Sequence, residues 1–133
     1  AVACINPVPA DPDAIEGLEW RESRGQQWIA VGPSTVGEIA YERLPIGAVR
    51  EMTRGVASID LSAVDRPVLL VTSAHDESVD PESADAIAEQ LPGEVQRLRL
   101  RESGHVATLD SERHLLQRAV VDFVSSVGVR ADQ

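Results

Sequence analysis

The second half of the chain shows two different patterns of apolar positions. Residues 67–73 form a short continuous apolar run with a proline at its start, which predicts a strand buried on both faces. Residues 95–100 instead alternate leucine with arginine, which predicts a strand with one wetter face. A further apolar run over residues 1–5 predicts a buried core strand at the start of the sequence.

A helical period follows the first of these two strands. Asp80 and Pro81 predict an N-cap and a first-turn proline. Apolar residues then recur at the i, i+3, i+4 and i+7 positions of one helix face, until the Pro-Gly pair at 92–93 ends the pattern. They are Ala84, Ile87, Ala88 and Leu91.

A second helical period follows the alternating strand. Asp110 or Ser111 predicts the cap of this last helix. Its apolar stripe is Leu115, Leu116, Ala119, Val120, Phe123, Val124 and Val127. The order strand, helix, strand, helix predicts an α/β fold with parallel strands joined by right-handed crossovers.

Residues 7–58 are less regular than the segments on either side. They contain five of the eight prolines and both tryptophans, with short helices predicted around 12–24 and 46–56. A loop-rich insertion of this size is usually functional, for example as a lid. We therefore expect a core strand at 1–6, a cap or lid insertion at 7–58 and a core segment at 59–133.

Composition narrows the possible partners and the compartment. The 12 basic residues, all arginine, stand against 22 acidic ones, and the net charge of −10 disfavours nucleic acid and anionic membranes as partners. No apolar run approaches the roughly 20 residues of a membrane span. The single cysteine, Cys4, is expected as a buried apolar residue of the first strand. With no visible signal-peptide pattern, we expect a cytoplasmic protein.

Polar residues capable of catalysis follow both strands of the second half. Asp76 comes after the first strand and His105 after the second, with Gly104 leaving room for the ring. Parallel strands end at one edge of a sheet, where ligands and chemistry gather, so we expect the two side chains to meet. A carboxylate that orients an imidazole is the acid and base pair of a hydrolytic triad.

Other interpretations of these residues are structural. Asp76 alone could cap a turn, His105 could be a loop histidine, and Asp80 is expected as an N-cap. His75, Glu77 and His114 are expected in solvent, and Glu102 and Ser103 could orient the histidine loop. A metal site from His75, Asp76, Asp80, His105 and Asp110 lacks any standard ligand spacing, so no metal or other cofactor is expected.

These stretches resemble a known family. The resemblance rests on Pro67-Val-Leu-Leu-Val-Thr-Ser-Ala-His-Asp76-Glu-Ser-Val79-Asp80-Pro81 and on Ser103-Gly104-His105-Val-Ala-Thr-Leu109-Asp110. Both are similar to the C-terminal part of α/β-hydrolases of the bacterial carboxylesterase and monoacylglycerol-lipase-like group. The resemblance implies that Asp76 and His105 are the triad acid and base. It also implies that Trp20, Trp28 and Val106 help to bind an acyl chain.

The sequence departs from the family at the nucleophile. The Gly-x-Ser-x-Gly elbow of α/β-hydrolases does not occur in it. The nearest string, Gly32-Pro-Ser34-Thr-Val-Gly37, is one residue too long and has proline before the serine. We therefore expect Ser34 in a cap turn, and we expect the chain to be a fragment whose nucleophile lies in an N-terminal half.

Two functions follow from these observations. The first is a serine hydrolase that cleaves small acyl esters, with the N-terminal half of the same protein as partner. The alternative is a non-catalytic α/β module that binds a partner or self-associates through an unpaired strand edge. The fold also hosts thioesterases, dehalogenases and C–C hydrolases, between which the resemblance does not decide.

Overall fold

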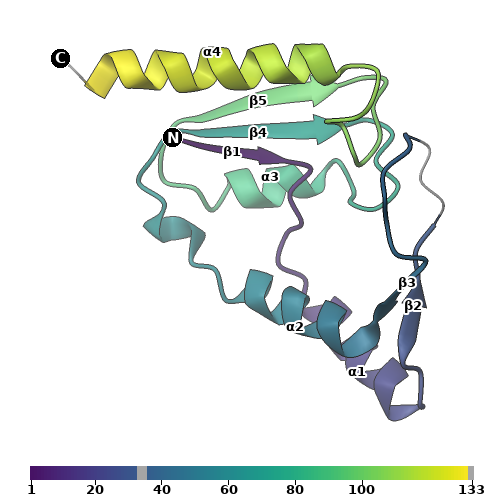
Figure 1. The fold of residues 1–133 in the computed structure, drawn as a ribbon. Coiled ribbons are helices and arrows are strands. Elements are labelled where there is room, and N and C mark those ends of the chain that lie inside the picture. Colours follow the sequence, from purple (N-terminus) through teal and green to yellow (C-terminus); the bar gives the residue numbers. More distant parts are fainter. Residues whose placement is uncertain (33–35, 132–133) are drawn as a thin grey trace. The chain divides into compact units, whose positions relative to one another are not determined.

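The chain divides into two units (Figure 1). The computed structural model describes residues 1–32 and 36–131, so Ser34 lies outside the described residues. The first unit contains Ala1–Val8 and Asp60–Gln133, and the second contains Pro9–Ile59. The role of residues 7–58 as a lid stays a prediction.

The first unit contains a parallel sheet of three strands. They are β1 (Val2–Ile5), β4 (Val68–Ser73) and β5 (Val95–Leu100), in the order β1-β4-β5. Val68 lies opposite Val2 on one side and Val95 on the other. All three strands therefore end at the same edge, and the predicted α/β class is confirmed.

Alternate residues of β4 pack on opposite faces of this sheet. Leu69 and Val71 join the core under α4 (Arg113–Ala131). Val68 and Leu70 join a second core with α3 (Ser83–Ala88), and Figure 1 shows the two helices on opposite faces. Burial on both faces explains why this strand is apolar from Val68 to Val71.

Val71 offers a direct test of this packing. Its side chain is 0% exposed, whereas Val121 on α4 is 62% exposed. We expect Val71→Ala to lower the free energy of unfolding by on the order of 2 kcal/mol, because it removes buried methyl groups and leaves a cavity. The matched Val121→Ala should change it by less than about 0.5 kcal/mol. Equal effects in urea titrations of both variants would contradict this core assignment.

Both helices of the first unit begin later than the sequence predicts. Asp80 does not cap α3, because its carboxylate accepts the Glu82 N–H at 2.9 Å within a preceding turn. The helix ends at Ala88, so Leu91 lies beyond it. The last helix begins at Arg113, because the Asp110 carboxylate binds other backbone groups.

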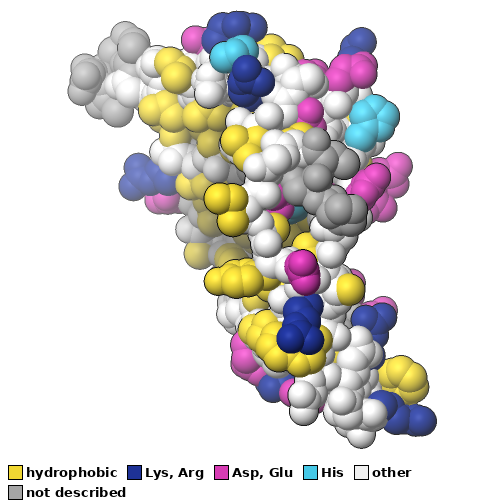
Figure 2. All heavy atoms as spheres, turned by 45° about the vertical axis from the view of Figure 1, so that its right-hand side comes forward, with side chains coloured by type: hydrophobic (Ala, Val, Ile, Leu, Met, Phe, Trp, Pro, Cys, Tyr) yellow, Lys and Arg dark blue, Asp and Glu magenta, His cyan; other side chains and the backbone are white. Residues whose placement is uncertain are grey.

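The apolar stripe of α4 is narrower than predicted. Its side chains in the core are Leu116, Val120, Phe123 and Val127. Leu115 and Val124 are exposed, so their assignment to the buried stripe is wrong. Val2 and Ile5 of the edge strand β1 are also exposed, and Figure 2 shows surface hydrophobic side chains in yellow.

The second unit is built on two packed helices. They are α1 (Pro12–Ser23) and α2 (Ile46–Ala57), both predicted to within one residue at each end. Ion pairs connect them, Arg50 to Glu22 and Arg54 to Glu19. The sequence did not predict the antiparallel pair β2 (Trp28–Ala30) and β3 (Arg43–Pro45), whose three-residue strands are too short to show alternation.

A short connection leads from the second unit back into the sheet. It contains the 3₁₀ helix η1 (Leu61–Ala63), capped by the Asp60 carboxylate, which accepts the Ser62 N–H at 3.0 Å. Leu61 and Val64 pack beside the core on the α3 face of the sheet. This packing fixes the chain immediately before β4.

Candidate active site

Asp76 lies in the loop that follows β4, with its side chain only 1% exposed. Its Oδ1 accepts the backbone N–H groups of Ser78 at 2.8 Å and Val79 at 2.9 Å. This is an Asx-type turn, in which an aspartate binds the backbone that follows it. The loop therefore holds the carboxylate in a fixed orientation.

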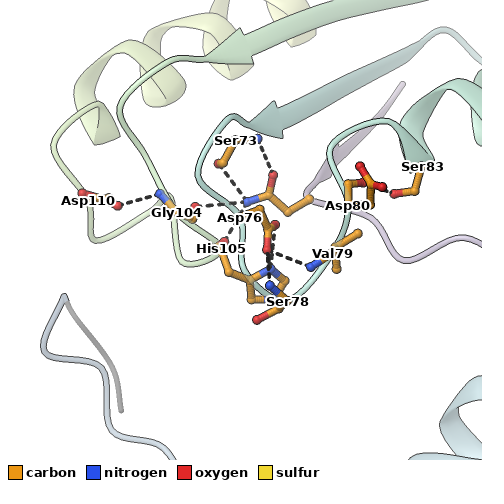
Figure 3. A network of polar contacts seen from close by, with 10 residues as sticks. Ser73, Asp76, Ser78, Val79, Asp80, Ser83, Gly104, His105 and Asp110 are labelled. Carbon is orange, nitrogen blue, oxygen red and sulfur yellow. Dashed lines mark hydrogen bonds and ion pairs between the residues drawn. The ribbon is translucent and has the colours of Figure 1, made fainter. Parts of the chain in front are cut away.

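The imidazole of His105 lies against this carboxylate. His105 Nδ1 is 2.9 Å from Asp76 Oδ2 and 3.1 Å from Oδ1 (Figure 3). An ionised carboxylate can only accept, so in the neutral form of the imidazole this contact favours the proton on Nδ1 and a lone pair on Nε2. The side chain is 41% exposed, and Nε2 has no hydrogen-bond partner within the described part of the chain. The Asp76 carboxylate can thus orient the His105 imidazole so that Nε2 can accept a proton. The catalytic role of the two residues stays a prediction.

Gly104 occupies a place where a larger residue would crowd the site. A Cβ at this position would lie 3.4 Å from the backbone oxygen of His75. The Gly104 N–H also donates to Asp110 Oδ2 at 2.8 Å (Figure 3). The close approach of the two loops therefore explains a glycine directly before His105.

Glu112 holds the histidine loop from the side of α4. Its carboxylate accepts from the backbone of Arg101 at 3.1 Å and of Glu102 at 2.9 Å, and from Ser103 Oγ at 2.8 Å. Burial alone raises the pKa of Glu112, but the hydrogen bonds from these three residues outweigh it and leave the pKa below its ordinary value.

Asp110 binds the same loop at Gly104, the residue directly before His105. Hydrogen bonds from the backbone N–H groups of Gly104, and secondly of Ser111, lower the pKa of this carboxyl. Two carboxylates thus accept most of the hydrogen bonds that residues 101–104 donate. The sequence suggested Glu102 and Ser103 for orienting the loop. Only Ser103 makes such a contact through its side chain.

Asn6 connects the end of β1 with the end of β4 and with the histidine loop after β5, and it was not among the residues selected from the sequence. Its Oδ1 accepts the Ser73 N–H at 2.8 Å, and its Nδ2 donates to Ser73 Oγ at 2.9 Å and to the backbone oxygen of His105 at 2.8 Å. The available signal was a polar residue directly after an apolar strand. Such a residue sits at the edge where parallel strands end.

The hydrogen-bond network described above does not include the side chains of the other residues selected from the sequence. His75, Glu77, Asp80 and His114 are exposed, and among the described residues their side chains form no hydrogen bond or ion pair with His105. Val106 is half-buried beside His105. Trp20 and Trp28 belong to the second unit, where Arg24 and Arg43 stack over their rings at 5.1 and 4.6 Å. An acyl-binding role for these three residues stays a prediction.

Residues 1–32 and 36–131 contain no group of three or more histidine, cysteine or acidic side chains arranged to hold a metal ion. None of their helices combines the length and the apolar character needed to cross a membrane.

The sequence has relatives among ester-cleaving enzymes. It is 28% identical over 90 residues to a carboxylesterase of Bacillus subtilis strain 168, covering 65% of this chain and 37% of the relative. It is 33% identical over 91 residues to a thermostable monoacylglycerol lipase of Bacillus sp. strain H-257, covering 66% and 36%. The chain thus spans about a third of the length of these relatives. No protein-family model matches it.

Solved structures show the same architecture. A chain from work on the metagenome-derived lipolytic enzymes LipS and LipT superposes with a TM-score of 0.78 at 25% identity, over 93% of this chain and 54% of that one. DcsB, solved with its substrate analogue, superposes with a TM-score of 0.58 at 14% identity, over 94% and 56%, which shows the fold alone. In sequence the chain is therefore similar to a carboxylesterase and a monoacylglycerol lipase, and in fold to lipolytic enzymes with the α/β-hydrolase architecture, of whose length it spans a part.

Proposed function

We propose that this chain supplies the acid and the base of a serine ester hydrolase. The observation that carries the proposal is the contact between the buried Asp76 carboxylate and His105 Nδ1 at 2.9 Å, which leaves Nε2 without a partner in the described part of the chain. A relationship to carboxylesterases and a monoacylglycerol lipase supports the same assignment.

In the proposed reaction, His105 Nε2 removes the proton of a serine hydroxyl as the serine oxygen attacks the ester carbonyl. Asp76 stabilises the imidazolium that forms and keeps its own negative charge. The imidazolium then gives the proton to the departing alcohol, which leaves an acyl-enzyme. A water molecule, deprotonated in the same way, releases the carboxylic acid.

The nucleophile of this scheme lies outside these 133 residues. None of the serines of the sequence stands in a Gly-x-Ser-x-Gly elbow. We propose that a preceding half of the same protein provides both this serine and the donors that stabilise the oxyanion. The substrates are small esters with short or medium acyl chains, monoacylglycerols among them, and the protein acts in the cytoplasm.

Labelling with an active-site-directed fluorophosphonate tests the proposal. The longer protein that carries these residues and the 133-residue chain are treated side by side, and the labelled peptide is identified by mass spectrometry. We expect label on one serine outside residues 1–133 of the longer protein, and none on the isolated chain.

Two other outcomes would overturn parts of the proposal. Label on Ser34 or any other serine of the isolated chain would overturn the external nucleophile. A longer protein that takes no label and hydrolyses no ester would favour a non-catalytic module. Self-association of the chain would then be the next property to measure, by sedimentation.

A further inference from the structure

We propose that Asn6 is a positioning residue for His105. Its carboxamide ties the backbone of the histidine to the end of β4 and so sets the imidazole against Asp76. This inference rests on the proposed role of His105 as the base, and it assigns a function to a residue that touches neither substrate nor reacting atoms.

The contacts of Asn6 connect the end of β1 with the end of β4 and with the loop that follows β5. The residue directly follows β1, is 6% exposed and donates its own N–H to the Val71 oxygen of β4 at 2.8 Å. Its Oδ1 and Nδ2 pair with the backbone N–H and the hydroxyl of Ser73, the last residue of β4. The remaining Nδ2 proton is directed to the backbone oxygen of His105 at 2.8 Å, with the Gly104 oxygen further away at 3.4 Å.

The backbone at this position also favours asparagine. Asn6 has φ +47°, and it is the non-glycine residue with positive φ in the described chain. Asparagine tolerates this left-handed region better than most side chains do. Glycine would satisfy the backbone but make no side-chain contact. Aspartate would keep the shape and the acceptor but lose the donor that meets the His105 oxygen.

The position of this hydrogen bond makes it relevant to catalysis. Glu112 and Asp110 bind the loop through residues 101–104, which precede the histidine. Asn6 instead holds the carbonyl of His105 itself. Without that bond the backbone of the histidine can shift, and a displacement of about 1 Å in a catalytic group can cost ~100-fold in rate.

The test compares Asn6→Asp and Asn6→Gly with Asp80→Asn in the longer protein, labelled with ¹⁵N-histidine. Asp80→Asn is a matched amide exchange in a neighbouring turn, where asparagine caps equally well. The readouts are kcat, KM and the far-downfield proton resonance of His105 Nδ1–H, which reports its hydrogen bond to Asp76. The melting temperature shows whether each variant is folded.

We expect both Asn6 variants to shift or broaden the Nδ1–H resonance and to lower kcat by about 10- to 100-fold, with KM changed less than about twofold. Asp80→Asn should leave all these quantities unchanged. A folded Asn6 variant with the wild-type resonance and kcat would overturn the proposal. A purely structural role would lower the melting temperature without moving the resonance.

A measurement on the unaltered protein covers the case in which neither variant folds. The side-chain amide protons of Asn6 should exchange with solvent far more slowly than those of Gln90, because both amides are hydrogen-bonded but Asn6 is buried and Gln90 is exposed. Equal exchange rates would overturn the inference. If the protein shows the resonance but hydrolyses no ester, the proposed function fails while the positioning by Asn6 stands.

Discussion

We expect His105→Ala to abolish nearly all ester hydrolysis by the longer protein, lowering kcat by ~10⁴-fold or more. The substitution removes the group that accepts the serine proton, and in the described chain no other histidine forms a side-chain hydrogen bond with Asp76. His114→Ala is the matched control, because that histidine is exposed on α4 and should leave kcat unchanged. Initial rates with a p-nitrophenyl acyl ester measure both.

We expect Asp76→Asn to lower kcat by a similar factor, but for a different reason. The Asp76 oxygen that accepts the Ser78 and Val79 N–H groups can be kept by asparagine, which leaves its amide group facing His105 Nδ1. An amide donor there favours the tautomer with the proton on Nε2, which cannot take the serine proton, and we expect a ~10⁴-fold lower kcat. Near-normal turnover by either variant would remove these residues from the mechanism.

A substitution in the histidine loop should also have a large effect, in this case on the stability of the folded protein. Glu112→Gln keeps the shape of the side chain but replaces one acceptor oxygen with a donor, facing Arg101, Glu102 and Ser103. We expect it to lower the free energy of unfolding by about 2 kcal/mol, because the hydrogen bonds lose their charge assistance and the new –NH₂ group faces a backbone N–H, of Arg101 or of Glu102, that a carboxylate oxygen accepted before. Glu102→Gln, in the same loop but exposed, should change it little.

Wild type and Glu112→Gln should differ in free energy of unfolding, and the pH dependence of this difference shows how much of it comes from the charge of Glu112. The folded-state pKa of Glu112 lies below its ordinary value of about 4.3, so the ionised group contributes its full stability above about pH 4.3 and loses it as the pH falls through the folded pKa. The difference between wild type and Glu112→Gln should therefore be constant near neutral pH and shrink in acid. Urea titrations at several pH values measure it, and a gap that persists in strong acid would contradict the role of the charge.

The sequence was informative where a pattern reflects burial. The continuous apolar run predicted β4, because a strand buried on both faces needs apolar side chains at successive positions. The alternation predicted β5, because a strand with one wetter face needs them only at every second position. Parallel strands ending at one edge then predicted that Asp76 and His105 would meet.

The supporting contacts left no comparable pattern. Asn6 and Glu112 bind mainly backbone groups, and every residue type offers the same N–H and C=O. The start of α4 was misplaced because Asp110 resembles an N-cap, although its carboxylate instead binds Gly104 across the loop. Sequence rules for helix capping assume that a polar side chain binds the first turn of the helix that follows it. Here the Asp110 carboxylate binds the Gly104 N–H instead, and this tertiary contact is not visible in the local sequence.

The pairing of β1 with β4 affects the order of folding. The contact of Asn6 with Ser73 spans 67 residues, whereas that of Asp76 with His105 spans 29. Closing the longer loop costs about 0.7 kcal/mol more chain entropy, and contacts of high sequence separation slow folding. The β4-α3-β5 segment can therefore associate first, with β1 docking later. Until it docks, His105 can lie beside Asp76 while its backbone is still unanchored.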